Sequence, residues 1–278
     1  MNKYKNKVAV VTGAGSGIGR AIALELASHG ASLALSDVNM GGLEETRSLL
    51  QARHSDVAVN IYSLDVSDQQ AVLDHAQQVN NDFSNIHFVF NNAGVALSSN
   101  LDDVKRKDFE WIMNINFWGV VNGTEAFLPY LKASGKTGDE SHIVNISSVF
   151  GMISLPTQGC YNASKFAVRG YTEALRQEMI ADGHNVGVNC IHPGGIATEI
   201  ARNARVSEGD DKEALAKDFD KLARTTPKKA AQTILAGVNK NKARIMIGAD
   251  AHVIHFLVRL LGAGYQVLTR KFMGAMQH

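Results

Sequence analysis

Short apolar runs rich in β-branched residues recur along the chain, and longer segments of helical periodicity separate them. The runs are 8–11, 33–36, 57–64, 86–90, 142–146, 186–191 and 244–247. Most are apolar at nearly every position, which is typical of parallel strands buried on both faces. The helical segments are 18–29, 42–53, 68–82, 108–133, 161–181 and 227–241. This alternation predicts an α/β fold, a doubly wound parallel sheet of about seven strands with helices on both faces.

No Pro- or Ser-rich linker and no internal repeat interrupts the alternation. We therefore expect residues 1–250 to form one domain and residues 251–278 to extend it. A charged segment, residues 202–221, follows the sixth predicted strand, close to where sheets of this kind bind ligands. Its charge fits a mobile lid and a solvated surface helix equally well.

Composition narrows the class of protein. The chain has 278 residues, 45% of them hydrophobic, with 28 Lys and Arg against 27 Asp and Glu. These values exclude a disordered chain and a disulfide scaffold, and they give no basic excess for binding nucleic acid. Only Cys160 and Cys190 are present, residues 1–7 are polar, and no apolar run reaches ~18 residues. We expect a cytoplasmic protein without signal peptide or membrane-spanning helix.

A glycine-rich turn directly follows the first predicted strand. Residues 12–19 read Thr-Gly-Ala-Gly-Ser-Gly-Ile-Gly, and a helical pattern begins at Ile18. The spacing of Gly13, Gly17 and Gly19 matches neither G-x-G-x-x-G nor a P-loop. Such a turn after a strand still lets the backbone approach a phosphate at a helix N-terminus.

An acidic residue stands where a dinucleotide fold would use one. Asp37 ends the second predicted strand, 18 residues after Gly19. A carboxylate there binds the adenosine ribose and repels a 2′-phosphate, which favours NAD over NADP. The alternative is an Asp that only ends the strand and caps the next turn.

Tyr161 and Lys165 are spaced to share one face of a predicted helix. At an effective dielectric constant of ~20 and a separation of ~4 Å, their attraction is roughly 4 kcal/mol before desolvation. A shift of that size would bring the tyrosine pKa towards neutrality and make the phenol a usable acid or base. The pair alone is common in ordinary helices.

Other polar residues end neighbouring strands. Ser147 and Ser148 follow the fifth run, residues 91–94 (Asn-Asn-Ala-Gly) follow the fourth, and residues 193–195 (Pro-Gly-Gly) end the sixth. The carboxyl ends of parallel strands meet at one edge of the sheet. Asn116 lies in an apolar helix, where a buried amide needs hydrogen-bond partners.

This ordered set of motifs resembles the short-chain dehydrogenase/reductase family over roughly residues 5 to 250. The motifs are T-G-x-x-x-G-x-G at 12–19, N-N-A-G at 91–94, Asn116, Ser148, Y-x-x-x-K at 161–165 and P-G at 193–194. Each is weak alone, but their order is specific. The resemblance implies a Rossmann fold and an oxidoreductase that uses a nicotinamide cofactor.

The resemblance also implies roles for individual residues. Tyr161 exchanges a proton with the substrate oxygen, and Ser148, rather than Ser147, hydrogen-bonds that oxygen. Lys165 lowers the tyrosine pKa and binds the nicotinamide ribose, while Asn116 holds a water in the proton relay. The expected substrate-lining residues are Val149, Gly151 and Ile153. The expected cofactor-binding residues are Gly13, Ser16, Gly17, Ile18, Gly19, Asp37, Asp65, Val66, Asn92, Ala93, Gly94, Tyr161, Lys165, Pro193, Gly194, Ile196 and Thr198.

The expected activity is NAD(P)-dependent interconversion of a secondary alcohol and a ketone, with NAD favoured, by a homodimer or homotetramer. A mostly apolar carbonyl compound is the expected substrate. The alternatives are a catalytically silent NAD(P)-binding sensor or scaffold, and a membrane-associated lipid-carbonyl reductase. We expect no metal, because His252 and His255 lack further ligands nearby in the sequence.

Residues 251–278 contain no acidic residue and do contain Arg259, Arg270 and Lys271. Tyr265, Leu268, Phe272 and Met276 form an apolar stripe at helical spacing, so the segment is expected to be a basic amphipathic helix. It could pack on the core or a second subunit, lie on an anionic membrane, or fray.

Overall fold

Seven parallel strands form one sheet in the order β3-β2-β1-β4-β6-β7-β9. The chain was analysed as a computed structural model that describes residues 3–207 and 211–276, with side chains only up to residue 270. The strand order reverses between β1 and β4, so the sheet is doubly wound as predicted, with a ligand crevice expected at that point. The strands are β1 (Val8–Thr12), β2 (Ser32–Asp37), β3 (Val59–Ser63), β4 (Phe88–Asn91), β6 (Ser141–Ile146), β7 (Val186–Pro193) and β9 (Arg244–Ile247).

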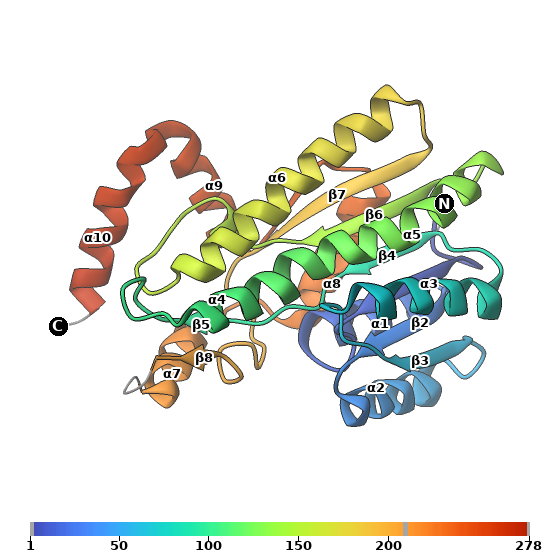
Figure 1. Cartoon of the computed structure of the whole chain (residues 1–278), viewed down its shortest axis with the longest axis horizontal. Helices are drawn as coiled ribbons and strands as arrows, with labels where there is room; N and C mark the ends of the chain where they lie inside the picture. Colours follow the sequence, from blue (N-terminus) through green and yellow to red (C-terminus); the bar gives the residue numbers. More distant parts are fainter. Residues whose placement is uncertain (1–2, 208–210, 277–278) are drawn as a thin grey trace.

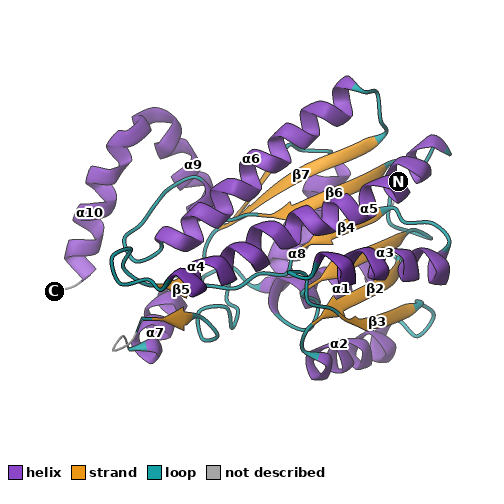
Figure 2. Ribbon diagram, viewed as in Figure 1, coloured by secondary structure: helices purple, strands orange, loops and turns teal. Residues whose placement is uncertain are grey.

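Helices cover both faces of this sheet (Figures 1 and 2). One layer contains α1 (Gly17–Ser28), α2 (Met40–Arg53) and α8 (Pro227–Asn239). The opposite layer contains α3 (Gln69–Phe83), α5 (Gly119–Lys136) and α6 (Gly159–Ala181).

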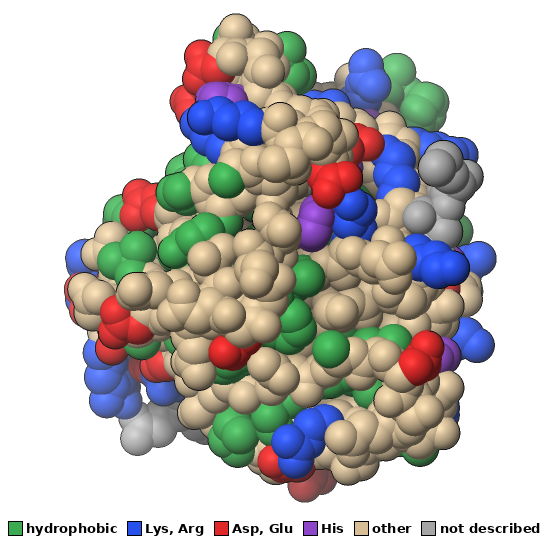
Figure 3. Space-filling view, turned by 90° about the vertical axis from the view of Figure 1, so that its right-hand side faces the viewer, with side chains coloured by type: hydrophobic (Ala, Val, Ile, Leu, Met, Phe, Trp, Pro, Cys, Tyr) green, Lys and Arg blue, Asp and Glu red, His purple; other side chains and the backbone are tan. Residues whose placement is uncertain are grey.

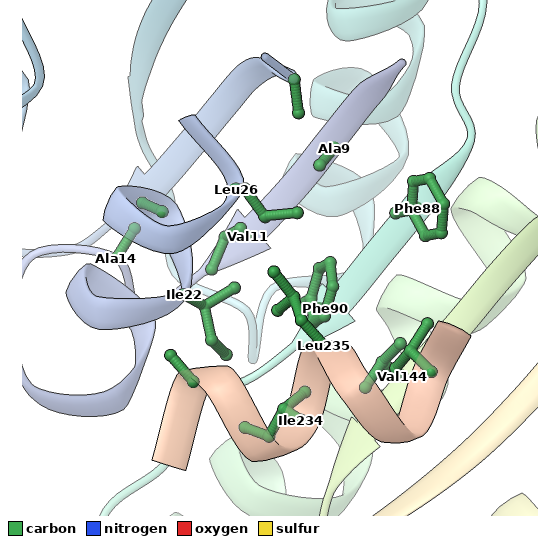
Figure 4. Packing of buried hydrophobic residues seen from close by; sticks show 14 of the residues in the cluster. Ala9, Val11, Ala14, Ile22, Leu26, Phe88, Phe90, Val144, Ile234 and Leu235 are labelled. Atoms are coloured by element: carbon green, nitrogen blue, oxygen red, sulfur yellow. The ribbon is translucent and has the colours of Figure 1, made fainter. Parts of the chain in front are cut away.

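The core alternates along β1 because successive side chains of a strand point to opposite faces. Ala9 and Val11 pack towards Ile22 of α1 and Ile234 of α8, as Figure 4 shows. Val10 belongs to the opposite cluster, with α3, α5 and α6. Every residue of β1 is buried, which explains its continuous apolar pattern.

The helix expected at 108–133 begins earlier and is not continuous. It consists of α4 (Arg106–Met113), a π-helical turn η1 (Asn114–Trp118), and α5. Asn116 is the buried residue of this turn, and its amide is bound to another segment of the chain. Periodicity could not reveal the turn, because a single wide turn changes the spacing of few side chains.

The charged segment after β7 contains regular structure. Its first part forms β8 (Arg205–Val206), which pairs in parallel with β5 (Leu97–Ser98). Its second part contains α7 (Lys212–Leu222), whose one fully buried residue is Ala216. The sequence analysis did not predict β5 or β8, because a strand of two residues is too short to show a periodic pattern.

The C-terminal segment forms two helices rather than one. A short turn η3 (Gly262–Gly264) separates α9 (Ala249–Leu261) from α10 (Tyr265–Met276). Together they make a bent hairpin that projects from the body of the molecule (Figure 1). The positions of the expected stripe at Phe272 and Met276 lie beyond the described side chains.

Surface charge is mixed on the face that Figure 3 shows, which is the right-hand side of Figure 1. Scattered Lys and Arg side chains lie there among scattered Asp and Glu side chains, and no large area has a single sign. Such a surface gives no single-sign field that would attract a polyanion.

Candidate active site

The glycine-rich loop lies at the carboxyl end of β1 and needs its glycines for steric reasons. Gly13 and Gly17 have φ angles of +65° and +52°, which side chains rarely adopt. A Cβ on Gly13 would lie 2.8 Å from the Cα of Ala93, and one on Gly19 would lie 2.1 Å from the Gly13 oxygen. The loop is therefore a backbone cradle that any larger residue would fill.

The amino end of α1 faces this cradle. Ser16 is the N-cap, its side chain makes no capping hydrogen bond, and the first turn contains no acid. The first turn of the helix thus adds no carboxylate of its own to the positive helix end, which suits an anion-binding terminus. Thr198 lies opposite, since a Cβ on Gly17 would be 3.3 Å from its Cγ2. Ile18 begins the helix behind them, and the arrangement fits a pyrophosphate.

Asp37 connects the end of β2 to the glycine-rich loop. Its Oδ2 accepts a hydrogen bond from the Gly15 N–H at 2.9 Å, and its Oδ1 accepts one from the Asn39 N–H at 2.9 Å. Arg20 reaches the Gly15 oxygen from α1 but is paired with Glu45. The carboxylate therefore dominates the charge beside the loop, in the place a ribose-binding acid would take.

The residues after β3 are held by a contact that the sequence did not reveal. Asn122 of α5 donates to the Val66 oxygen at 2.9 Å, and Gly119 packs against the Val66 side chain. Exposed Asp65 accepts from the Ser67 N–H and hydroxyl. Asn122 was not identified in the sequence. It could have been, because it is a polar residue in an apolar helix, the same feature that identified Asn116.

The segment after β4 is fastened to the loop after β1. The Asn92 amide donates to the Thr12 and Gly13 oxygens, at 2.9 and 3.2 Å. The Thr12 hydroxyl accepts from the backbone N–H groups of Asn92 and Ala93. The Asn92 side chain thus holds the two loops together.

Asn116 joins three segments of the chain from inside the π-helical turn. Its Oδ1 accepts from the Val95 N–H at 2.8 Å, and its Nδ2 donates to the Val95 oxygen at 3.0 Å and the Ser164 hydroxyl at 3.1 Å. Gly94 lies against it, because a Cβ there would be 3.1 Å from Oδ1. These contacts use both donors of the amide and one of the two acceptor positions of Oδ1, so the second acceptor position is open to a water of the expected proton relay.

Ser148 and Tyr161 lie together at the carboxyl end of β6. Both Ser147 and Ser148 are buried, but the Ser147 hydroxyl is directed away and donates to the Lys165 oxygen at 2.8 Å. Desolvation raises the pKa of Tyr161 to about 12, although a hydrogen bond with Ser148 opposes this. The phenol is therefore protonated near neutral pH.

The strong effect expected of Lys165 on this pKa is not found. Its Nζ lies 5.7 Å from the centroid of the Tyr161 ring and donates to the Ile146 oxygen at 3.0 Å. Lys165 is only 4% exposed, and its burial lowers its own pKa to about 8. The loss of water raises the pKa of Tyr161 more than the attraction of Lys165 lowers it. The attraction is weak because the ammonium bonds to the Ile146 carbonyl instead of to the phenol.

His192 supports Ser148 and was not identified in the sequence. Its Nδ1 lies 2.9 Å from the Ser148 carbonyl oxygen, and the ring is fully buried. Burial lowers the pKa of His192 to about 4, so the neutral ring donates from Nδ1 to that carbonyl. A histidine that ends an apolar strand has no distinguishing pattern in a sequence.

The loop after β7 is held by the first turn of α9. The Asp250 Oδ2 accepts from the Gly195 N–H at 2.7 Å, and a Cβ on Gly194 would lie 2.1 Å from the same carboxylate. Pro193 ends β7, and Ile196 is buried beyond it. Asp250 thus positions the loop, although it lies 55 residues away in the sequence.

The expected substrate-lining residues belong to the short helix η2 (Val149–Gly151) and the loop after it. Val149 and Ile153 are buried, and Gly151 packs against Ser147, whose Oγ would be 2.4 Å from a Cβ there. Asn162 holds the loop by donating to the Phe150 and Ile153 oxygens at 3.1 and 2.8 Å. A hollow of about 420 Å³ lies alongside, lined by Leu101, Ser154, Leu155, Gly159, Asn162, Ala163 and Phe166.

Among the described side chains, residues 3–207 and 211–270, no group of three or more His, Cys, Asp or Glu could hold a metal ion. His252 and His255 lie on α9. The polar groups instead fit a dinucleotide, with a backbone cradle for phosphates at one end and the Ser148–Tyr161 pair at the other.

Comparison with known proteins agrees with this geometry. The family model described as short chain dehydrogenase matches residues 7–209. SadH of Mycobacterium tuberculosis, which carries an oxidoreductase name, is 52% identical over 269 residues, covering 96% of this chain and 95% of SadH. An oxidoreductase of Staphylococcus saprophyticus is 34% identical, covering 93% of this chain and 98% of its own.

A solved structure shares both the fold and the sequence pattern. The short-chain dehydrogenase/reductase of Burkholderia phymatum in complex with NAD has 30% identity and a TM-score of 0.85, covering 96% of this chain and 97% of its own. The fold, the motifs and these relatives together establish that the chain belongs to the short-chain dehydrogenase/reductase family of NAD(P)-binding oxidoreductases.

Proposed function

We propose that this protein interconverts a secondary alcohol and a ketone and uses NAD(H) in preference to NADP(H). The arrangement that supports this most directly is the pair Ser148 and Tyr161 beside buried Lys165, at the carboxyl edge of the sheet. A protonated phenol and a neighbouring hydroxyl are the groups that a carbonyl oxygen needs when it becomes an alkoxide.

In the direction of reduction, Tyr161 donates its proton to the substrate oxygen while Ser148 hydrogen-bonds the same oxygen. His192 holds the Ser148 backbone from behind. Lys165 places a positive charge within 5.7 Å of the phenol ring, which favours the phenolate left after proton transfer. A bound nicotinamide would supply the hydride.

Asp37 supports the preference for NAD. Its two oxygens already accept from the Gly15 and Asn39 N–H groups, and a carboxylate has further acceptor capacity for ribose hydroxyls. A 2′-phosphate in the same place would meet the negative charge. The B. phymatum relative was solved with NAD, in line with this preference.

The substrate we propose is a mostly apolar carbonyl compound. Val149, Ile153 and Met152 next to the Ser148 loop are all apolar and buried. We further propose a cytoplasmic homodimer or homotetramer formed through α5 and α6. The turn before α5 and the surface of α6 expose aromatic side chains, with Trp118 50% and Phe166 39% exposed.

The test is turnover of NADH and NADPH with a panel of aliphatic, cyclic and long-chain ketones, for the wild type beside Tyr161→Phe. We expect NADH-dependent turnover that falls by about three orders of magnitude in the variant, while NADH still binds to it. Cofactor binding without turnover of any ketone would favour the silent sensor. Turnover retained in Tyr161→Phe would refute the mechanism.

A further inference from the structure

The C-terminal helix α9 is apolar on two opposite sides. Its inner side packs on the body of the protein through buried Ala251 and partly buried Ile254. Its outer side carries Val253, Phe256 and Leu260, which are 57%, 64% and 68% exposed. Their spacing of three and four residues places them in one stripe along the helix. A surface helix in water normally has polar residues on that side.

The apolar surface continues past the turn between the helices. Leu261 precedes the turn and is 38% exposed, while Val267 and Leu268 on α10 are each 48% exposed. An apolar 18-residue stretch within the segment from Ala249 to Arg270 is only 6% buried, and by length and composition that segment could cross a membrane. Contiguous exposed apolar surface of this kind marks an interaction site.

The charge of this segment identifies the class of partner. No acidic residue follows Asp250 in the sequence. Arg259 and Arg270 are exposed, and neither forms an ion pair with any side chain in the described part of the chain. Apolar side chains flanked by unpaired cations are suited to a surface that is apolar beneath and negatively charged at its rim, as an anionic bilayer is.

The geometry favours a segment that lies on a bilayer over one that spans it. The helix α9 has 13 residues, which gives a length of about 20 Å at ~1.5 Å per residue, whereas a hydrocarbon core is ~30 Å thick. The turn at 262–264 then changes the direction of the chain, and Gly262 has a φ of +50°. Neither helix alone could cross.

Both helices are fixed to the candidate active site. Asp250 at the start of α9 accepts from the Gly195 N–H of the loop after β7. Tyr265 at the start of α10 accepts, through its hydroxyl, from the Ser154 N–H at 2.9 Å. The hairpin is thus held at a defined place next to the loop that follows Ser148, and it projects beyond the body there (Figure 1).

We propose that the hairpin α9–α10 docks this protein on the surface of an anionic lipid bilayer, with Val253, Phe256 and Leu260 inserted among the acyl chains and Arg259 and Arg270 at the headgroups. The docked hairpin holds the loop after Ser148 close to the membrane. An apolar carbonyl compound dissolved in the bilayer then has a short path to the site. The binding itself is independent of catalysis and of the proposed substrate.

The experiment is flotation of the full chain with vesicles of phosphatidylcholine alone or mixed with phosphatidylglycerol. We expect the wild type to float with the mixed vesicles and weakly with phosphatidylcholine alone. The variant Phe256→Gln/Leu260→Gln should lose about a hundredfold of its partitioning, because each large apolar side chain that leaves water contributes about tenfold or more. Ile180→Gln, at a 66% exposed position of α6, is the matched control and should float like the wild type.

A second variant separates the charge from the apolar stripe. Arg259→Gln/Arg270→Gln should reduce binding to the mixed vesicles about tenfold or more, at roughly 1 kcal/mol for each cation, and leave binding to phosphatidylcholine unchanged. Circular dichroism and NADH binding report whether each variant is folded. The proposal is refuted if the wild type fails to float, or if Phe256→Gln/Leu260→Gln floats equally well. A smaller oligomer by light scattering in that variant, with flotation unchanged, would assign the stripe to a second copy of the chain.

Discussion

The ammonium of Lys165 and the ring of Tyr161 are 5.7 Å apart, and the ammonium bonds to the Ile146 oxygen at 3.0 Å instead of to the phenol. Both groups have lost most of their hydration, so the neutral form of each is favoured. At neutral pH the phenol is uncharged and Lys165 remains protonated, so the cost of burying a charge falls on Lys165.

This cost predicts how stability depends on pH. The pKa of Lys165 is about 8 in the folded protein against 10.5 for an ordinary lysine, so the unfolded chain binds the proton more tightly between these values. The contribution of Lys165 to the free energy of unfolding therefore rises as the pH increases from about 8 towards 10.5, by on the order of 3 kcal/mol in total.

The measurement is denaturant unfolding of the wild type and of Lys165→Met from neutral pH up to pH 10. Above pH 10, the ordinary pKa of tyrosine, the raised pKa of Tyr161 makes stability fall with pH and opposes the contribution of Lys165. We expect Lys165→Met to be more stable at neutral pH and its advantage to shrink as the pH rises. A difference between the two proteins that does not change with pH would show that the charge of Lys165 is not buried.

Replacing Asn116 with Ala should destabilise the protein and abolish turnover together. The substitution leaves the Val95 N–H and carbonyl without their amide partner, and each buried group left unsatisfied costs about 1–3 kcal/mol. Urea unfolding with a cofactor-binding titration measures both effects. Asn114→Ala, at an exposed position of the same π-helical turn, should leave both unchanged. A fully stable Asn116→Ala protein would contradict the structural role.

Replacing Asp37 with Asn should change the choice of cofactor. The amide keeps the size and an acceptor for the Gly15 N–H but loses the negative charge. We expect NADH affinity to fall about tenfold, as for other hydrogen bonds to charged groups, and NADPH affinity to rise. Fluorescence titration with both cofactors measures the shift, and Asp56→Asn, an exposed acid before β3, is the control. Tighter NADPH binding by the wild type would show that the role of Asp37 was misread.

Removing the Tyr265 hydroxyl should loosen the C-terminal hairpin without touching the cofactor site. In Tyr265→Phe the Ser154 N–H loses its acceptor, which weakens the attachment by about 1 kcal/mol. We expect faster proteolysis between α9 and α10 and a higher KM for apolar ketones, with NADH affinity unchanged. Tyr130→Phe on α5 provides the matched control. If proteolysis and KM are both unchanged, the hydrogen bond between Tyr265 and Ser154 neither holds the hairpin nor affects substrate binding.

Local patterns in the sequence were enough to predict the parallel sheet, the glycine-rich turn and the helix face that Tyr161 and Lys165 share. Continuous apolar runs such as 8–11 predict buried parallel strands because both faces of such strands are covered. The spacing of Tyr161 and Lys165 predicts a shared helix face because α-helical geometry repeats every 3.6 residues. These features depend on neighbours along the chain, so they can be read without a structure.

The tertiary structure alone decided which side chains support the site. Asp250 reaches Gly195 and Tyr265 reaches Ser154 across 55 and 111 residues, distances at which no pattern in one sequence links two positions. It also decided that Lys165 bonds to the Ile146 carbonyl and that burial outweighs its attraction for Tyr161. Hydration and long-range packing are properties of the folded chain, whereas the order of the seven main strands and the helices between them is already present in its sequence.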